Sequence, residues 1–209
     1  MTTAPSNRPG ATPLWKPLAP NQRRVLGVLI EKAKTTPAGY PMSVNAIVVG
    51  CNQKSNRDPL MNLDHIDVSN TLVERERMGA VTEVDWVGRV SKYKHRAYEW
   101  LGVERVELAV MGELLLRGVQ SMGDLRVRAA RMEPIADLAA LKPIVEGLIA
   151  RKLMIEITAP GRGQMVGHNL YSEPERKELR LRPPGSSGTA VASGETTVAA
   201  AKESTAAGV

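Results

Sequence analysis

The sequence predicts a mainly α-helical protein with small β-hairpins, of the α+β class, in which one unit of three helices and a hairpin occurs twice. Three observations support this fold class. Apolar residues recur at helical spacing in two groups of three segments. Each group is followed by two strand-like stretches that a glycine-containing turn joins. The chain of 209 residues is also long enough for two small domains.

The first domain is expected over residues 20–100, after a flexible leader of residues 1–19 that holds four prolines. Residues that favour helix ends bound its three helices. These helices are expected to span Asn21–Lys34, to start at Ser43, and to run from Asp64 or Asp67 to Met78 before Gly79. Two strands are expected to follow, joined by a turn at Val87–Arg89: Val81–Trp86 and Val90–Tyr98.

The second domain is expected over residues 101–173 and repeats the order of the first. Its helices are expected at Glu104–Arg117, Ser121–Met132 and Ile135–Lys152, and its strands at Leu153–Thr158 and Gln164–Tyr171. The segment Leu26-Gly27-Val28-Leu29-Ile30 corresponds to Met111-Gly112-Glu113-Leu114-Leu115, which favours duplication over two unrelated domains. A short helical turn is expected over residues 174–182, and residues 183–209, rich in Gly, Ser, Ala and Thr, are expected to be disordered.

Three short helices followed by a hairpin are the pattern of a winged helix, so the sequence predicts two winged-helix domains with disordered termini. The first copy is longer because a polar stretch, Gly50–Leu63, separates its second and third helices. This stretch holds the side-chain amides of Asn52, Gln53 and Asn56. We expect Asn52–Asn62 to form an ordered loop in which Asn and Asp side chains bond to nearby backbone groups.

Composition restricts the function without naming it. The chain is 43% hydrophobic and has no Phe, so its core must be aliphatic. Its net charge of +6 permits contact with nucleic acid but does not require it. The single cysteine, Cys51, excludes an internal disulfide framework and fits a reducing compartment. No stretch resembles a signal peptide or a membrane span, so we expect a cytoplasmic protein that makes no membrane contact.

Five sequence blocks resemble the bacterial YceH-like family, and together they cover about residues 20–173. They are Pro41-Met-Ser-Val-Asn45, Cys51-Asn-Gln-Lys-Ser-Asn-Arg-Asp-Pro59, Arg89-Val-Ser-Lys-Tyr-Lys-His-Arg96, Leu115-Leu-Arg-Gly118 and Val127-Arg-Ala-Ala-Arg-Met132. The resemblance implies a tandem winged-helix protein and no particular activity. The leader and the alanine-rich tail lie outside it.

Basic residues suggest where nucleic acid would bind. They fall in three patches, which are the hairpin residues Arg89, Lys92, Lys94 and Arg96, the helical residues Arg126, Arg128 and Arg131, and the loop residues Lys54 and Arg57. The loop amides add further donors, and such groups suit phosphate and sugar contacts. Each patch alone is also what a solvated basic face would show, and the sequence does not reveal whether the patches converge.

The third helix of the first domain argues against base readout. Ser69, Asn70, Arg75 and Arg77 are balanced there by four acidic residues, Asp64, Asp67, Glu74 and Glu76. Those carboxylates are expected to repel phosphate. The sequence therefore favours a regulatory DNA-binding protein with mainly phosphate contacts. The alternative is a protein-interaction scaffold, similar to the tandem winged-helix adaptor ScpB. Double-stranded DNA, a protein partner and a second copy of the chain are the candidate partners.

Catalysis is not expected. Cys51 precedes His65 by fourteen residues, but its helical spacing favours a place in the core. The scattered histidines do not form a metal-ligand pattern. No phosphate-binding or dinucleotide-binding glycine motif is present, so no cofactor is expected.

Overall fold

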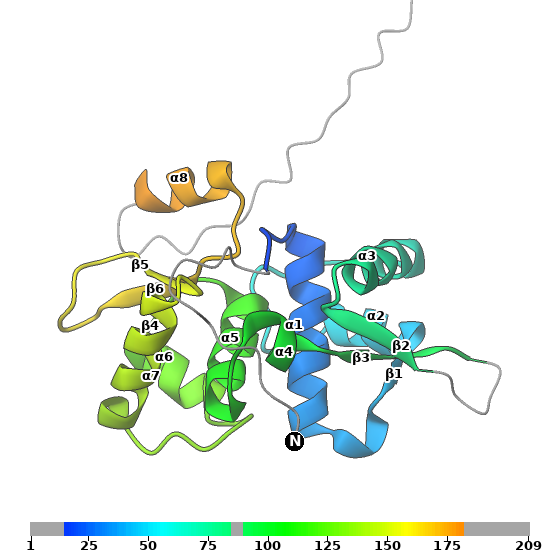
Figure 1. Ribbon diagram of the computed structural model, residues 1–209, viewed down its shortest axis with the longest axis horizontal. Helices are drawn as coiled ribbons and strands as arrows, with labels where there is room; N and C mark the ends of the chain where they lie inside the picture. Colours follow the sequence, from blue (N-terminus) through cyan, green and yellow to red (C-terminus); the bar gives the residue numbers. More distant parts are fainter. Residues whose placement is uncertain (1–14, 85–89, 182–209) are drawn as a thin grey trace, which may run out of the picture.

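The computed structural model describes residues 15–84 and 90–181 (Figure 1). The first half of the chain contains α1 (Pro20–Thr35), the 3-10 helix η1 (Pro37–Gly39), β1 (Met42–Ser43), α2 (Val44–Cys51), α3 (His65–Arg77), β2 (Val81–Val84), β3 (Lys92–His95) and α4 (Ala97–Leu101). The second half contains α5 (Arg105–Arg117), β4 (Gln120–Ser121), α6 (Met122–Ala129), α7 (Leu138–Ala150), β5 (Met154–Glu156), β6 (Met165–His168) and α8 (Glu173–Leu181). The predicted class, mainly helical with small antiparallel sheets, is confirmed.

Each half has one antiparallel three-stranded sheet of the same topology. The strand orders are β1-β3-β2 and β4-β6-β5, so a two-residue strand before the second helix adds to the hairpin that follows the third. Thr82 pairs with Lys94 in the first sheet, and Ile155 pairs with Gly167 in the second. The two-residue strands were not predicted, because they are too short to show alternation.

Local side-chain bonds explain most of the helix ends. Ser43 Oγ accepts a hydrogen bond from the Ala46 amide at 3.3 Å, and Asp64 and Ser121 cap α3 and α6 in the same way. Gly79 follows α3 with φ +73°, a conformation that glycine adopts without strain. These predicted helix ends are confirmed.

Several predicted boundaries were wrong. Tyr98 belongs to a helical turn, α4, because the chain turns back toward the core there and buries Trp100 and Leu101. Helix α1 begins at Pro20, so Asn21 is not its cap. Helix α7 begins only at Leu138, because Asp137 caps it.

The chain ends also differ in part from expectation. The helical turn predicted for residues 174–182 is a nine-residue helix, α8. Residues 15–19 of the expected leader are placed in the fold, where Leu18 is buried and its amide donates to the Leu170 carbonyl at 2.8 Å. Residues 1–14, the turn at residues 87–89 and the tail from residue 182 lie outside the described residues.

Helices α1 and α5 pack against each other at the centre of the molecule (Figure 1). Gly27 of α1 faces Leu115 and Leu116, whereas Gly112 of α5 faces Ile30, so the two helices run in opposite directions. A Cβ atom built on Gly112 would lie 2.7 Å from Ile30 Cγ2, which shows how closely the helices approach. The hydrophobic core is consequently one cluster that both halves share.

Candidate functional site

The polar segment Asn52–Asn62, which follows α2, is an ordered loop, as predicted. The side chain of Asn52 closes it, because Nδ2 donates to the Leu63 carbonyl and Oδ1 accepts from the Leu63 amide, both at 2.8 Å. The Asp58 amide donates to the Leu116 carbonyl at the end of α5 at 3.0 Å. The loop thus ties the first half of the chain to the second.

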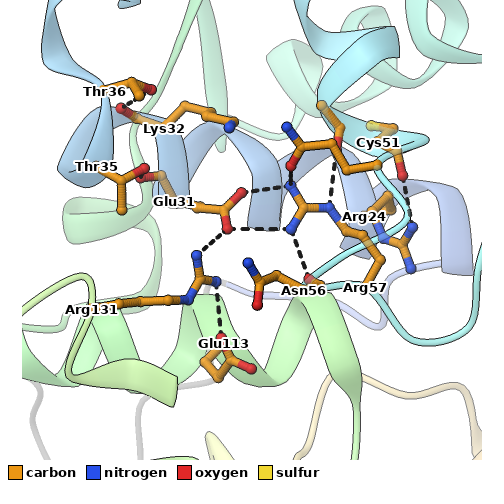
Figure 2. Close-up of polar contacts among 12 residues, drawn as sticks. Arg24, Glu31, Lys32, Thr35, Thr36, Cys51, Asn56, Arg57, Glu113 and Arg131 are labelled. Carbon is orange, nitrogen blue, oxygen red and sulfur yellow. Dashed lines mark hydrogen bonds and ion pairs between the residues drawn. The ribbon is translucent and has the colours of Figure 1, made fainter. Parts of the chain in front are cut away.

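Arg57 of this loop is buried and points into the molecule (Figure 2). Its guanidinium donates to both carboxylate oxygens of Glu31 on α1, at 2.5 and 3.2 Å. Its remaining bonds go to Gln53 Oε1 and to the carbonyls of Gly50 and Asn56. These five contacts match the five donors of a guanidinium, so Arg57 keeps none for a phosphate.

Arg131 extends the cluster to the second half of the chain (Figure 2). One of its terminal nitrogens bonds to Glu31, and the other bonds to Glu113 on α5 at 3.0 Å. Glu113 is fully buried and also lies 3.2 Å from Arg117 Nε. We call Glu31, Arg57, Glu113, Arg117 and Arg131 the buried ionic cluster.

The two carboxylates of the cluster respond differently to burial. Burial raises the pKa of Glu31, but the hydrogen bonds and charges of Arg57 and Arg131 outweigh it and hold that pKa below its ordinary value. For Glu113 burial prevails, and its pKa is raised despite the guanidinium of Arg131. The cluster is a structural link between the halves. Arg57 and Arg131 are therefore removed from the candidate nucleic-acid contacts.

The other two arginines of the predicted helical patch are also engaged. Arg126 donates to the carbonyls of Ile135 and Ala136, at 3.4 and 3.1 Å. Arg128 donates to Gln120 Oε1 at 2.7 Å and lies 3.6 Å from Asp124. These bonds fix α6 to the segments around it. The patch does not present a row of free cations to a ligand.

Two cations of the predicted hairpin patch face solvent: Lys94 on β3, and Arg96, which follows β3 as the N-cap residue of α4. Lys94 and Arg96 are exposed, and neither forms an ion pair or a side-chain hydrogen bond within residues 15–84 and 90–181. Lys92 on the same strand is half-buried, and Arg89 lies outside the described residues. The loop residue Lys54 is exposed. The three predicted patches therefore do not merge into one surface, because Arg57 and Arg131 meet in the interior.

The His95 side chain of strand β3 packs against two tyrosine rings. The His95 ring lies 6.0 Å from that of Tyr40 and 5.8 Å from that of Tyr98, and its Nδ1 accepts from the Ala97 amide at 3.2 Å. Burial lowers the pKa of His95 to about 4. The ring is therefore neutral near pH 7 and adds no charge to the hairpin.

A groove of about 680 Å³ runs beside these residues, between the hairpin and α4. Lys94 and Arg96 line it together with Glu83 and Glu99. Its two cations and two carboxylates balance, so the groove has no net charge that would favour an anion.

The four acidic side chains at α3 are all engaged in local contacts. Asp64 and Asp67 form a reciprocal capping box at the start of the helix. Glu74 accepts a hydrogen bond from Gln22 Nε2 of α1 at 2.5 Å. Glu76 accepts one from a backbone amide of strand β2 at 2.9 Å. The Asp-x-x-Asp spacing of Asp64 and Asp67 is a sequence signal for such a capping box, and our interpretation of the sequence did not use it.

The exposed side of α3 differs from what the charge count suggested. Ile66 and Val73 are 68% and 48% exposed, and Asn70 and Arg77 are exposed beside them. Arg75, which the sequence placed among the candidate readers, is buried. The outward surface thus combines two apolar and two hydrogen-bonding side chains, and the exposed carboxylates of Glu74 and Glu76 flank them.

Cys51 lies in the core, as predicted. Its side chain is fully buried, and burial raises the pKa of the thiol to about 12. Within the described parts of the chain, no group of His, Cys, Asp or Glu side chains could hold a metal ion. No helix there has the length and apolarity needed to cross a bilayer.

The sequence matches a family described as "Protein of unknown function, DUF480" over residues 18–162. A UPF0502 protein of Rhodopirellula baltica is 51% identical over 164 residues, which cover 78% of this chain and 69% of the relative. A UPF0502 protein of Geotalea daltonii is 43% identical over 77% of this chain and 76% of its own length. A UPF0502 protein of Shewanella halifaxensis is 36% identical over 79% of this chain and 81% of its own length.

These relatives are bacterial and cover nearly all of the described chain, which confirms the resemblance noted in its sequence blocks. The protein therefore belongs to the DUF480 family of bacterial proteins.

Proposed function

We propose that this protein is a non-enzymatic, cytoplasmic regulator that binds double-stranded DNA through its first half, mainly by phosphate contacts. The observation that carries the proposal is the exposed pair of Lys94 on β3 and Arg96, which directly follows that strand. Neither side chain has a carboxylate partner among the described residues. When such cations neutralise phosphates, the counterions that were condensed on the DNA are released, and this release favours binding.

The arrangement of the first half supports this use of the hairpin. Its order of helices and its three-stranded sheet support the assignment of this half as a winged helix. In DNA-binding proteins of the helix-turn-helix type, a recognition helix enters the major groove while neighbouring elements contact the backbone. Helix α3 and the hairpin lie together at the end of the molecule remote from α6 and α7 (Figure 1). A duplex could reach both without meeting the second half.

The second half is proposed to support this surface and not to bind DNA itself. Arg126, Arg128 and Arg131 are held by internal acceptors, and α7 carries Lys142 in a loose pair with Glu146 at 3.9 Å. Few phosphates would therefore be contacted per chain. We expect moderate affinity that falls as salt is raised, with a slope of log K against log salt of about −0.9 for each phosphate contacted.

The test is a titration of a mixed-sequence duplex at two salt concentrations, followed by fluorescence anisotropy. Replacing Lys92, Lys94 and Arg96 together by Ala should weaken binding to all sequences alike. It should also flatten the slope of log K against log salt by up to about three units, if each side chain neutralises one phosphate.

A second triple variant controls for net charge. Lys142→Ala, Arg162→Ala and Lys177→Ala remove the same charge from exposed positions of the second half. This variant should bind nearly as the natural chain does. Equal losses in the two variants would mean that binding follows net charge alone, and the assignment to the hairpin would fail.

The second candidate function is a protein-interaction scaffold. It is favoured by large apolar side chains that stand exposed in both halves, namely Ile66, Val73, Val127 and Leu138. A scaffold would bind no duplex even at low salt. It would instead retain a protein partner that is lost when Asn70 and Arg77 are changed. No measurable duplex binding at low salt would replace the DNA proposal with this one.

A further inference from the structure

We infer that the outer face of α3 reads base edges in the major groove, with Asn70 and Arg77 as the residues that determine sequence preference. This inference rests on the proposed function, because it takes duplex DNA as the ligand. It goes beyond phosphate contact by assigning the protein a preferred DNA sequence. It also reverses the expectation that the acidic residues of this helix would prevent base readout.

Four exposed residues form a single stripe along α3. Ile66, Asn70, Val73 and Arg77 follow one another at i, i+4, i+7 and i+11. With 3.6 residues per turn, they fall within about 60° of arc on the helix surface. Val68 and other residues of the opposite face are buried in the core. The stripe is thus the side of α3 that solvent, or a ligand, meets.

The side chains of the stripe have the chemistry that base edges require. Asparagine pairs in a bidentate manner with N6 and N7 of adenine, and arginine with O6 and N7 of guanine. Apolar side chains such as Ile66 and Val73 can contact the methyl group of thymine. The side chains of Asn70 and Arg77 make no hydrogen bond or ion pair within the described residues, so their donors and acceptors are available.

The carboxylates of α3 do not lie on this stripe. Asp64 and Asp67 accept hydrogen bonds from the first turn of the helix, where their charge also balances the helix dipole. Glu74 and Glu76 lie on either side of the stripe, about 40° and about 60° beyond its edges. Each is held by an internal donor, Gln22 Nε2 and a β2 amide respectively. A duplex that met the stripe would therefore face no carboxylate head-on.

Charge complementarity favours a duplex over a protein as the occupant. Lys94 and Arg96 stand unpaired on the hairpin of the same half, and Arg77 ends the stripe with a third unpaired cation. Phosphates on either side of a major groove would complement this arrangement.

The corresponding helix of the second half lacks such a stripe. The sequence of α7 contains no Asn, Gln or Arg, and its exposed charges, Lys142 and Glu146, face each other. One chain therefore carries one reading helix. We expect each chain to recognise a single short site and not a pair of half-sites.

The test is a selection from a random-sequence duplex library with the full chain, compared with the double variant N70A/R77K. Lysine keeps the charge of Arg77 but cannot reproduce its planar bidentate contact. The natural chain should enrich a short motif, and the variant should lose it. The affinity ratio between selected and scrambled duplex should fall roughly ten-fold to hundred-fold per lost contact, while affinity for the scrambled duplex stays unchanged.

A matched control applies the same chemical changes elsewhere. N62A/R162K alters two exposed residues outside α3 and should enrich the same motif as the natural chain. If the natural chain binds the library without enriching any motif, the proposed function stands and this inference is refuted. If N70A/R77K enriches the same motif with the same preference, α3 is not the reader and the inference is again refuted. If no duplex binds even at low salt, the proposed function itself fails.

Discussion

Replacing Arg57 by Met should destabilise the protein by about 3–5 kcal/mol, the range expected when one partner of a buried ion pair is removed. The Arg57 side chain is 0% exposed, and that of Glu31 is 2% exposed. The substitution removes both hydrogen bonds to Glu31 and the bonds that hold the polar loop. Glu31 would keep only Arg131 as a charged partner. Methionine is chosen because it fills similar space without adding a polar group.

Urea unfolding of Arg57→Met should be followed by circular dichroism and by tryptophan fluorescence together. Coincident transitions would show that the two halves still unfold as one unit, which the free-energy comparison requires. Lys142→Met is the matched control, because its side chain is 72% exposed and pairs only loosely with Glu146, at 3.9 Å. It should cost no more than about 1 kcal/mol. A loss below about 1 kcal/mol for Arg57→Met would show that the buried ion pair between Arg57 and Glu31 does not stabilise the fold.

Two further outcomes follow from the α1–α5 contact and from the C-terminal helix. Gly112→Ala should lower the free energy of unfolding by about 1–3 kcal/mol, because the added methyl would lie 2.7 Å from Ile30. Gly147→Ala, on an open helix face, should raise the free energy of unfolding by about 0.5–1 kcal/mol. If urea titrations gave the same change for both substitutions, the close packing at Gly112 would be contradicted. Burial raises the pKa of Glu175, but the hydrogen bond from Arg23 and its other contacts lower it to about 2, from an ordinary 4.5. The stability that Glu175 contributes is therefore present above pH 4.5 and lost as pH falls toward 2. Glu175→Gln should reduce the change of melting temperature with pH between these values. An unchanged profile would refute the role of this carboxylate.

The fold could be predicted from the sequence because its signals are local. Ser43, Asp64 and Ser121 mark helix starts through bonds to amides three residues on, and such spacing is legible in a sequence. The short strands β1 and β4 escaped notice because two residues cannot show a period. They depend on pairing with β3 and β6, which the chain reaches much later.

The candidate site was less predictable because its contacts are distant along the chain. Arg131 was assigned to nucleic acid from its place in a run of arginines, yet its partner Glu31 lies 100 residues away. Arg57 looked like a loop cation for the same reason, and Glu31 lies 26 residues before it. On α3 the charge count led us to expect that four acidic residues would repel phosphate. It recorded their number but not the local contacts that each side chain makes.

The contact between α1 and α5 has a consequence for how the two halves could diverge. Gly27 and Gly112 occupy corresponding positions of the repeat, and each lies opposite the other helix. Two separate copies of one half could meet through the same face, but every substitution would then occur on both sides of the axis. In one continuous chain the sides are independent. Glu113 stands where the first half has Val28, so a single buried carboxylate meets Arg131 without an identical charge opposite it. Joining the halves covalently thus permits an asymmetric interface. It also allows the surface of one half to change while that of the other stays the same.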